Sequence, residues 1–87
     1  MGQSITLNSR FIIKRKLKKV NDVYILPPGY IPNELGLKII NYCDGKHTIK
    51  DIVTLISEEY DKNIKVIKKD VIRFVKKLLF LSVLKVV

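Results

Sequence analysis

The chain contains few side chains that could serve as acids, bases, nucleophiles or metal ligands. Its one histidine, His47, lies in a polar stretch where a general base would need an orienting partner, and the sequence indicates none. Its one cysteine, Cys43, falls at an apolar position of an expected helix, where cysteine usually packs as a small hydrophobe. No second cysteine or histidine is spaced for a zinc site. We therefore expect no catalytic residue, no bound metal and no cofactor.

Three acidic residues near one expected helix end, Glu58, Glu59 and Asp61, are the remaining candidates for chemistry. Nothing around them in the sequence indicates burial, so we interpret them as solvated side chains. The sequence also contains no phosphate-binding loop, dinucleotide fingerprint or nucleophile elbow. These observations predict that the protein is not an enzyme.

Positive charge is the strongest compositional signal. Seventeen Lys and Arg residues against eight Asp and Glu residues give a net charge of +9. Such a charge favours an anionic partner, whether nucleic acid, an acidic peptide, an acidic protein face or a membrane surface, or it only keeps the protein soluble. The cations form two clusters. One comprises Arg10, Lys14, Arg15, Lys16, Lys18 and Lys19, and the other comprises Lys68, Lys69, Arg73, Lys76 and Lys77.

The length of 87 residues allows one domain with one modest core. We expect a flexible N-terminus over residues 1–9 and a single domain over residues 10–87. One cysteine permits no internal disulfide, which fits a cytoplasmic protein. The most apolar run, Leu78–Leu84, is far shorter than the roughly 20 residues that cross a bilayer, so no membrane partner is expected.

Strand patterns precede the first expected helix. The first shows a partial alternation of apolar and basic residues, and the second is a run of residues with strong β-strand preference. A turn at 20–22 and a Pro-Pro-Gly reversal at 27–29 connect the strands, and Pro32 must end the third because it has no N–H to donate. The expected strands cover 11–17, 23–26 and 30–31.

Three helices are expected next. Asn33 is a typical N-cap for the first, which ends at Asp44-Gly45. Its apolar face comprises Leu35, Gly36, Ile39, Ile40 and Cys43. Thr48 and Asp51 are spaced as a capping box for the second. The third has a continuous apolar face, and the β-branched residues after it favour a short extended tail at 83–87. The expected helices cover about 34–43, 49–60 and 67–81.

Several segments of the chain together resemble the PqqD family, and the likeness extends over residues 10–84. The most specific part is the Cys-Asp-Gly turn, which is followed by Thr48 and an Ile-Val stripe at a set distance from the strands. The matching segments are Val23–Tyr30, Asn33, Ile39–Gly45, Thr48–Val53, Tyr60 and Asp70–Val71, with Phe74 and Leu78.

The resemblance implies an α+β fold of the winged helix-turn-helix type, in which a three-stranded antiparallel sheet is followed by three helices. It also implies a function without catalysis. Such a domain binds the leader of a ribosomally synthesised precursor peptide as an added strand and presents the peptide to a modifying enzyme, often a radical S-adenosylmethionine enzyme. The expected peptide-binding residues are Tyr30, Ile31, Lys69, Arg73, Phe74, Lys76, Lys77 and Leu78. For Phe74 and Leu78, a place in the core fits the pattern equally well.

Two other functions fit the same residues. A basic winged helix could bind nucleic acid, although only Arg73 on the expected third helix could form a bidentate contact with guanine. An adaptor could instead dock on an acidic protein. Steep loss of affinity with salt would indicate nucleic acid or a purely electrostatic adaptor, whereas strand addition into an apolar groove depends less on salt. An exposed edge strand permits either a monomer or a dimer.

Overall fold

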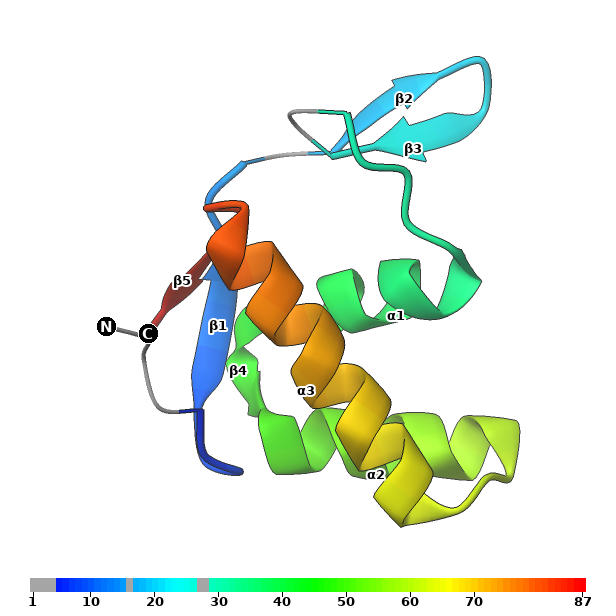
Figure 1. Cartoon of the computed structure of the whole chain (residues 1–87), viewed down its shortest axis with the longest axis vertical. Coiled ribbons are helices and arrows are strands. Elements are labelled where there is room, and N and C mark those ends of the chain that lie inside the picture. Colours follow the sequence, from blue (N-terminus) through cyan, green and yellow to red (C-terminus); the bar gives the residue numbers. More distant parts are fainter. Residues whose placement is uncertain (1–4, 16, 27–28) are drawn as a thin grey trace.

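A computed structural model describes residues 5–15, 17–26 and 29–87, and these form three helices and five short strands (Figure 1). The helices are α1 (Glu34–Tyr42), α2 (Ile49–Tyr60) and α3 (Ile64–Phe80). The strands are β1 (Arg10–Ile13), β2 (Lys18–Val20), β3 (Val23–Ile25), β4 (Asp44–Thr48) and β5 (Leu84–Val86).

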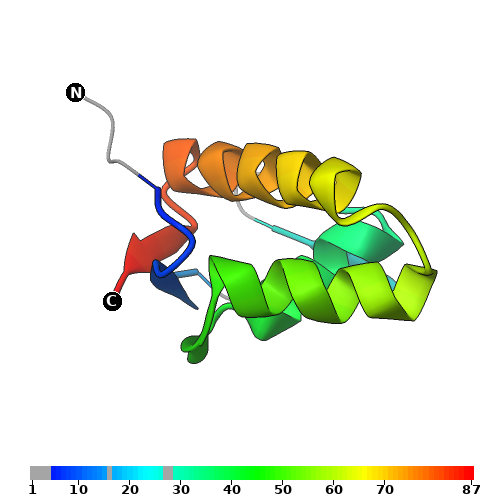
Figure 2. The ribbon, with the colours of Figure 1, turned by 90° about the horizontal axis from the view of Figure 1, so that it is seen from below.

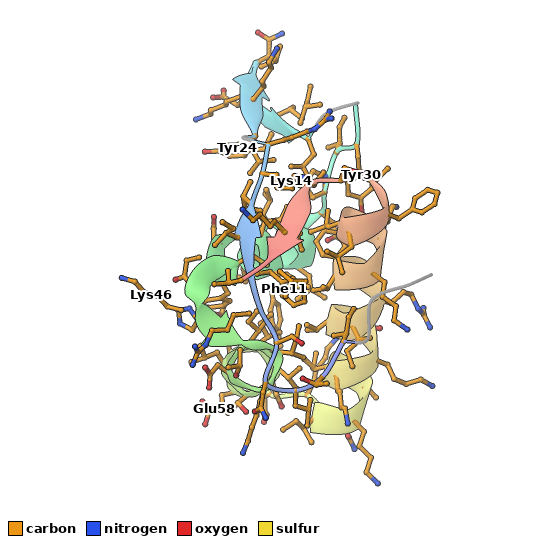
Figure 3. All side chains as sticks on the ribbon, turned by 90° about the vertical axis from the view of Figure 1, so that its left-hand side faces the viewer. Phe11, Lys14, Tyr24, Tyr30, Lys46 and Glu58 are labelled. Carbon is orange, nitrogen blue, oxygen red and sulfur yellow. The ribbon has the colours of Figure 1, made fainter. Side chains whose placement is uncertain are left out.

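The three-stranded sheet has β1 at its centre, with β4 and β5 antiparallel on either side. Phe11 of β1 pairs with Val86 and is completely buried. The ladder to β4 is irregular between Arg10 and Ile12, which pair with Thr48 and Asp44. Figure 3 shows Phe11 in the interior, so the central strand ties the sheet to the helices.

The composition of this sheet differs from the prediction. The strand expected over 11–17 ends at Ile13, the expected tail becomes β5, and the stretch expected to be a loop after α1 becomes β4. The sequence of β4, Asp-Gly-Lys-His-Thr, has low strand propensity. It is a strand because β1 offers it a partner, and that pairing depends on the tertiary structure.

The other two strands form a separate hairpin. Asn21 and Asp22 both have positive φ, as the tight two-residue turn between β2 and β3 requires. On the other side of β3, Leu26 and Tyr30 form an isolated antiparallel bridge, which stands where the third strand was expected. The predicted Pro27-Pro28 part of the turn lies outside the described residues. The strand that pairs with β3 is thus Lys18–Val20, where no strand was expected, and neither the hairpin nor the bridge joins the main sheet.

Side-chain caps define the helix starts. Asn33 Oδ1 accepts from the backbone N–H of Gly36 at 2.8 Å, and Thr48 forms the predicted capping box with Asp51. The N-cap of α3 is Asn63, so this helix begins earlier than expected. Helices α2 and α3 pack against each other (Figure 2) and close over one apolar core. Its buried helical members are Ile39, Ile40, Ile49, Ile52, Val53, Ile56, Ile67, Val71, Val75 and Leu78.

The structure confirms an α+β fold with a small antiparallel sheet and three helices, compatible with a winged-helix-like domain. Among the residues described, no helix is long and apolar enough to cross a membrane. Residues 1–4 lie outside the description, whereas Leu7 and Ser9 accept backbone hydrogen bonds from Lys50 and Ile49. Flexibility of the whole N-terminus therefore stays a prediction.

Candidate functional site

A groove of about 340 Å³ lies between α1 and α3, beside the bridge that ends the hairpin. It brings together four of the residues that the sequence indicated for peptide binding, namely Tyr30, Arg73, Phe74 and Lys77. The remaining residues that line it are Asn33, Leu35, Gly36, Ile39 and Asp70.

The helical repeat explains why α3 supplies one wall. Asp70, Arg73, Phe74 and Lys77 are separated by three or four positions, so they project from the same side of the helix. Val71, Val75 and Leu78 occupy the adjacent stripe and are completely buried. The core stripe therefore holds α3 in place while the neighbouring stripe borders the groove.

An aromatic pair with a cation forms one end of the groove. The ring centroids of Tyr30 and Phe74 are 6.2 Å apart with an interplanar angle of 44°, a tilted arrangement that aromatic rings favour. The Nζ atom of Lys77 lies 4.0 Å from the centroid of the Tyr30 ring, within the range of a cation–π interaction. These contacts connect the bridge residue Tyr30 to α3.

Gly36 lets α1 approach Phe74 closely. A Cβ atom at this position would lie 2.9 Å from Phe74 Cζ and 3.1 Å from Pro32 Cβ. Glycine therefore fits here because it lacks a Cβ atom, and not because of its φ, which lies outside the left-handed region. The sequence placed Gly36 on the buried side of the helix but did not indicate that it forms the groove wall.

The structure places the other predicted site residues outside the groove lining. Lys69 and Lys76 are exposed on α3, Ile31 is 58% exposed, and Leu78 is completely buried in the core. Of the two residues that fitted either core or groove, Phe74 therefore borders the groove and Leu78 packs inside. Lys16, in the first basic cluster, lies outside the described residues.

Five groove residues were not among those predicted. Asn33 had been interpreted only as a helix cap, and Leu35 and Ile39 only as part of an apolar helix face. Asp70 was part of the family likeness without a role, yet it lies three residues before Arg73, and that spacing could have indicated a shared wall. The α1 residues carried no such signal, because their place opposite α3 depends on packing.

The backbone at the bridge leaves an edge open. Tyr30 accepts a hydrogen bond from Leu26 N at 2.7 Å and donates one to Leu26 O at 2.8 Å. The polar groups of the next residue in an extended chain point the opposite way. Ile31 accordingly has no backbone hydrogen bond within the described part of the chain, and Pro32 after it has no N–H.

A second hollow of about 230 Å³ adjoins the groove and shares Asn33, Leu35 and Asp70 with it. Tyr60 lies at its far side, and the buried Tyr60 hydroxyl has no hydrogen-bond partner among the residues described. The hollow therefore continues the groove toward Tyr60, the last residue of α2.

The residues first considered for catalysis lie elsewhere. Asp44 lies beside His47, with His47 Nδ1 3.0 Å from each carboxylate oxygen, so the histidine has the partner that the sequence did not indicate. This hydrogen bond, with the backbone N–H of Lys46, lowers the pKa of Asp44 to about 2. Burial raises the pKa of the Cys43 thiol to about 12, so it stays protonated and is a poor nucleophile. Neither His47 nor Cys43 lines the groove.

The described residues contain no group of three or more His, Cys, Asp or Glu side chains placed to hold a metal ion. What the groove presents is an apolar floor, one carboxylate, two cations and an open backbone edge. That combination is suited to binding an extended peptide.

Comparison with known protein families gives one match. The model of the family described as coenzyme PQQ synthesis protein D (PqqD) matches residues 25–80, more than half of the chain. No curated protein and no solved structure matches the chain. The matched segment begins in β3 and ends with α3, so it includes every residue that lines the groove.

Proposed function

The chain belongs to the PqqD family, and from this premise we propose that it captures the leader of a ribosomally synthesised precursor peptide and presents it to a separate modifying enzyme, of the radical S-adenosylmethionine class. The family is one of accessory proteins in biosynthesis, which act without catalysis of their own. The observation that carries the proposal is the groove between α1 and α3, which lies directly beside an open backbone edge.

The edge supplies contacts that any peptide sequence can make. A leader strand lies along Ile31 and exchanges main-chain hydrogen bonds with its N–H and C=O groups, which have no backbone partner among the residues described. Pro32 limits this pairing because it cannot donate, and Tyr30 already uses both of its groups on Leu26. The added ladder is therefore short, and most of the specificity comes from side chains.

The groove selects leader side chains by size and charge. An aliphatic or aromatic residue of the leader fits against Leu35, Ile39 and Phe74, and the apolar area it buries is the main source of affinity. A leader carboxylate next to it pairs with Arg73 or Lys77, and Asp70 repels a second one nearby. The leader is thus an amphipathic strand with one large apolar residue beside an acidic residue.

The exposed cations of α3 have a smaller role. Lys69 and Lys76 lie outside the groove lining, and exposed ion pairs contribute only about 0–1 kcal/mol each. They attract an acidic leader over a distance and raise the rate of capture more than the affinity.

Amide chemical-shift titrations test this function. Isotope-labelled protein is titrated with a synthetic leader from the candidate precursor and, separately, with a random DNA duplex. Leader binding predicts shifts at Tyr30, Ile31, Gly36 and α3 with the peptide alone, and little change with salt. Broad shifts over the lysines of β2 and α3 with DNA alone would instead establish a nucleic-acid-binding protein.

A further inference from the structure

The β2–β3 hairpin has two different faces. The register places Lys18 opposite Ile25 and Val20 opposite Val23, and alternation along each strand puts these four side chains on one face. Leu26 is on the other face and is completely buried. Leu26 therefore packs in the core just after β3, whereas Lys19 and Tyr24 on its face of the hairpin are exposed, as are Lys18, Val20 and Val23 on the other face.

The face that carries Val20, Val23 and Ile25 is mainly apolar and extends beyond the hairpin. Continuing the register of the bridge places Ile31 opposite Ile25, and the following proline favours an extended conformation at Ile31. Val20 is 50% exposed, Val23 40% and Ile31 58%. We call Val20, Val23, Ile25 and Ile31 the outer hairpin face. Adjacent exposed aliphatic residues of this kind mark interaction sites on soluble proteins.

Cations border the outer hairpin face. Lys18 lies on the face itself, and Lys14 and Arg15 precede the hairpin in exposed positions. The only carboxylate of the hairpin is Asp22, which lies at the turn 3.8 Å from Lys19. A second copy of this chain would bring like charges together, whereas a surface bordered by carboxylates would attract them.

We propose that the outer hairpin face docks on the modifying enzyme, at an apolar patch of that enzyme bordered by Asp and Glu residues. The identity of this partner rests on the proposed function, and of the outer hairpin face only Ile31 also belongs to the segment that pairs with the leader. Tyr30 borders the groove, and Ile31, the next residue, points to the outer hairpin face. A leader paired along this segment therefore lies next to the docked enzyme.

The arrangement of the fold supports docking at this place. Figure 1 shows the hairpin standing apart from the three-stranded sheet and from α2, so a large partner can reach it without contacting them. Four aliphatic side chains make a small interface, and small interfaces belong to transient complexes. A transient complex suits a protein that delivers one peptide after another.

The experiment compares two double variants in binding to a purified candidate modifying enzyme of the radical S-adenosylmethionine class. V20T/V23T keeps the branched shape and strand preference of valine but makes the outer hairpin face polar. I64T/V66T makes the same change at residues of α3 that are equally exposed, 51% and 52%. We expect V20T/V23T to bind the enzyme about tenfold more weakly and I64T/V66T to bind it as the wild type does.

Three further measurements make the result decisive. Both variants should bind the synthetic leader with wild-type affinity, and Lys18→Glu should weaken enzyme binding and reduce its salt dependence. Wild-type enzyme affinity in V20T/V23T, or equal losses in both variants, would overturn the proposal. So would loss of leader binding in V20T/V23T, or a wild-type dimer in sedimentation that this variant dissociates. If the wild-type protein does not bind the leader, the proposed function is refuted. The docking proposal is still tested in that case, because the affinity of the variants for the enzyme can be measured without leader.

Discussion

Gly36 of α1 and Phe74 of α3, which both line the groove, lie so close together that no room is left for a Cβ atom at position 36. An added Cβ would lie 2.9 Å from Phe74 Cζ, closer than such contacts allow, and Phe74 is the neighbour able to move. This contact sets the distance between the two walls of the groove. The close packing of α1 against α3 at this pair therefore also determines the shape of the candidate binding site.

Gly36→Ala should separate stability from binding. Alanine is favoured over glycine in a helix by about 1 kcal/mol, which offsets the cost of displacing Phe74, so the unfolding free energy should change little. The displaced ring should obstruct the groove and lower leader affinity about fivefold or more. The double variant G36A/F74L, with a shorter side chain at 74, should regain part of that affinity in calorimetry. No difference between G36A and wild type would show that the peptide does not use this part of the groove.

Lys77→Met should weaken leader binding about three- to tenfold. The change keeps an unbranched apolar stem but removes the charge that lies 4.0 Å from the Tyr30 ring and that is available to leader carboxylates. Lys76→Met is the matched control, because Lys76 is exposed and does not line the groove. Titration calorimetry of both variants measures the difference. Equal losses of leader affinity in the two variants would show that Lys77 contributes only through the net charge of the protein.

Ile31→Pro should abolish leader binding while the helices stay intact. Proline removes the N–H that an added strand would accept from, and it requires an extended conformation at Tyr30 that the bridge already imposes. Ile31→Val keeps the N–H and should bind normally. Circular dichroism checks the helices, and fluorescence anisotropy with labelled leader measures binding. A proline variant with wild-type affinity would place the peptide elsewhere.

Phe74 and Leu78 should give opposite results on truncation. Leu78 is completely buried, so Leu78→Ala should lower the unfolding free energy by about 2–5 kcal/mol. Phe74 is only partly buried and borders the groove. Phe74→Ala should therefore lower the unfolding free energy less than Leu78→Ala does, and should weaken leader binding more. Urea unfolding and calorimetry of the two variants test this. A larger affinity loss for the folded Leu78→Ala protein would contradict the assignment of Phe74.

Acid should destabilise the fold partly through Asp44. Its pKa is lowered to about 2 in the folded protein, by the His47 side chain first and then by the Lys46 N–H. A group whose pKa is depressed on folding contributes stability above its unfolded pKa of about 4, and that contribution is lost as the pH falls from about 4 to about 2. Asp44→Asn and His47→Gln should both flatten the fall in unfolding free energy across this range in urea titrations. If the unfolding free energy of Asp44→Asn falls with pH as steeply as that of the wild type, Asp44 does not contribute to the acid sensitivity.

Local signals in the sequence determined the helices and the turn of the hairpin, although β2 was not expected as a strand. Asn33 and Thr48 carry short side chains that cap the next turn of backbone, and Asn21-Asp22 tolerates the positive φ values of a tight turn. The apolar repeat of α3 likewise determined which of its sides is buried. Each of these features depends on residues within a few positions of one another, so the sequence alone was sufficient to predict them.

Only the tertiary structure decided how the strands pair and what closes the groove. β1 pairs with β5 from the opposite end of the chain, and β4 becomes a strand despite a sequence with low strand propensity. The distinction between Phe74 and Leu78 also depends on where α1 lies against α3, and Gly36 sets that distance. These relationships join residues far apart in sequence, and their energies come from packing and ladder hydrogen bonds that exist only when the whole chain has folded.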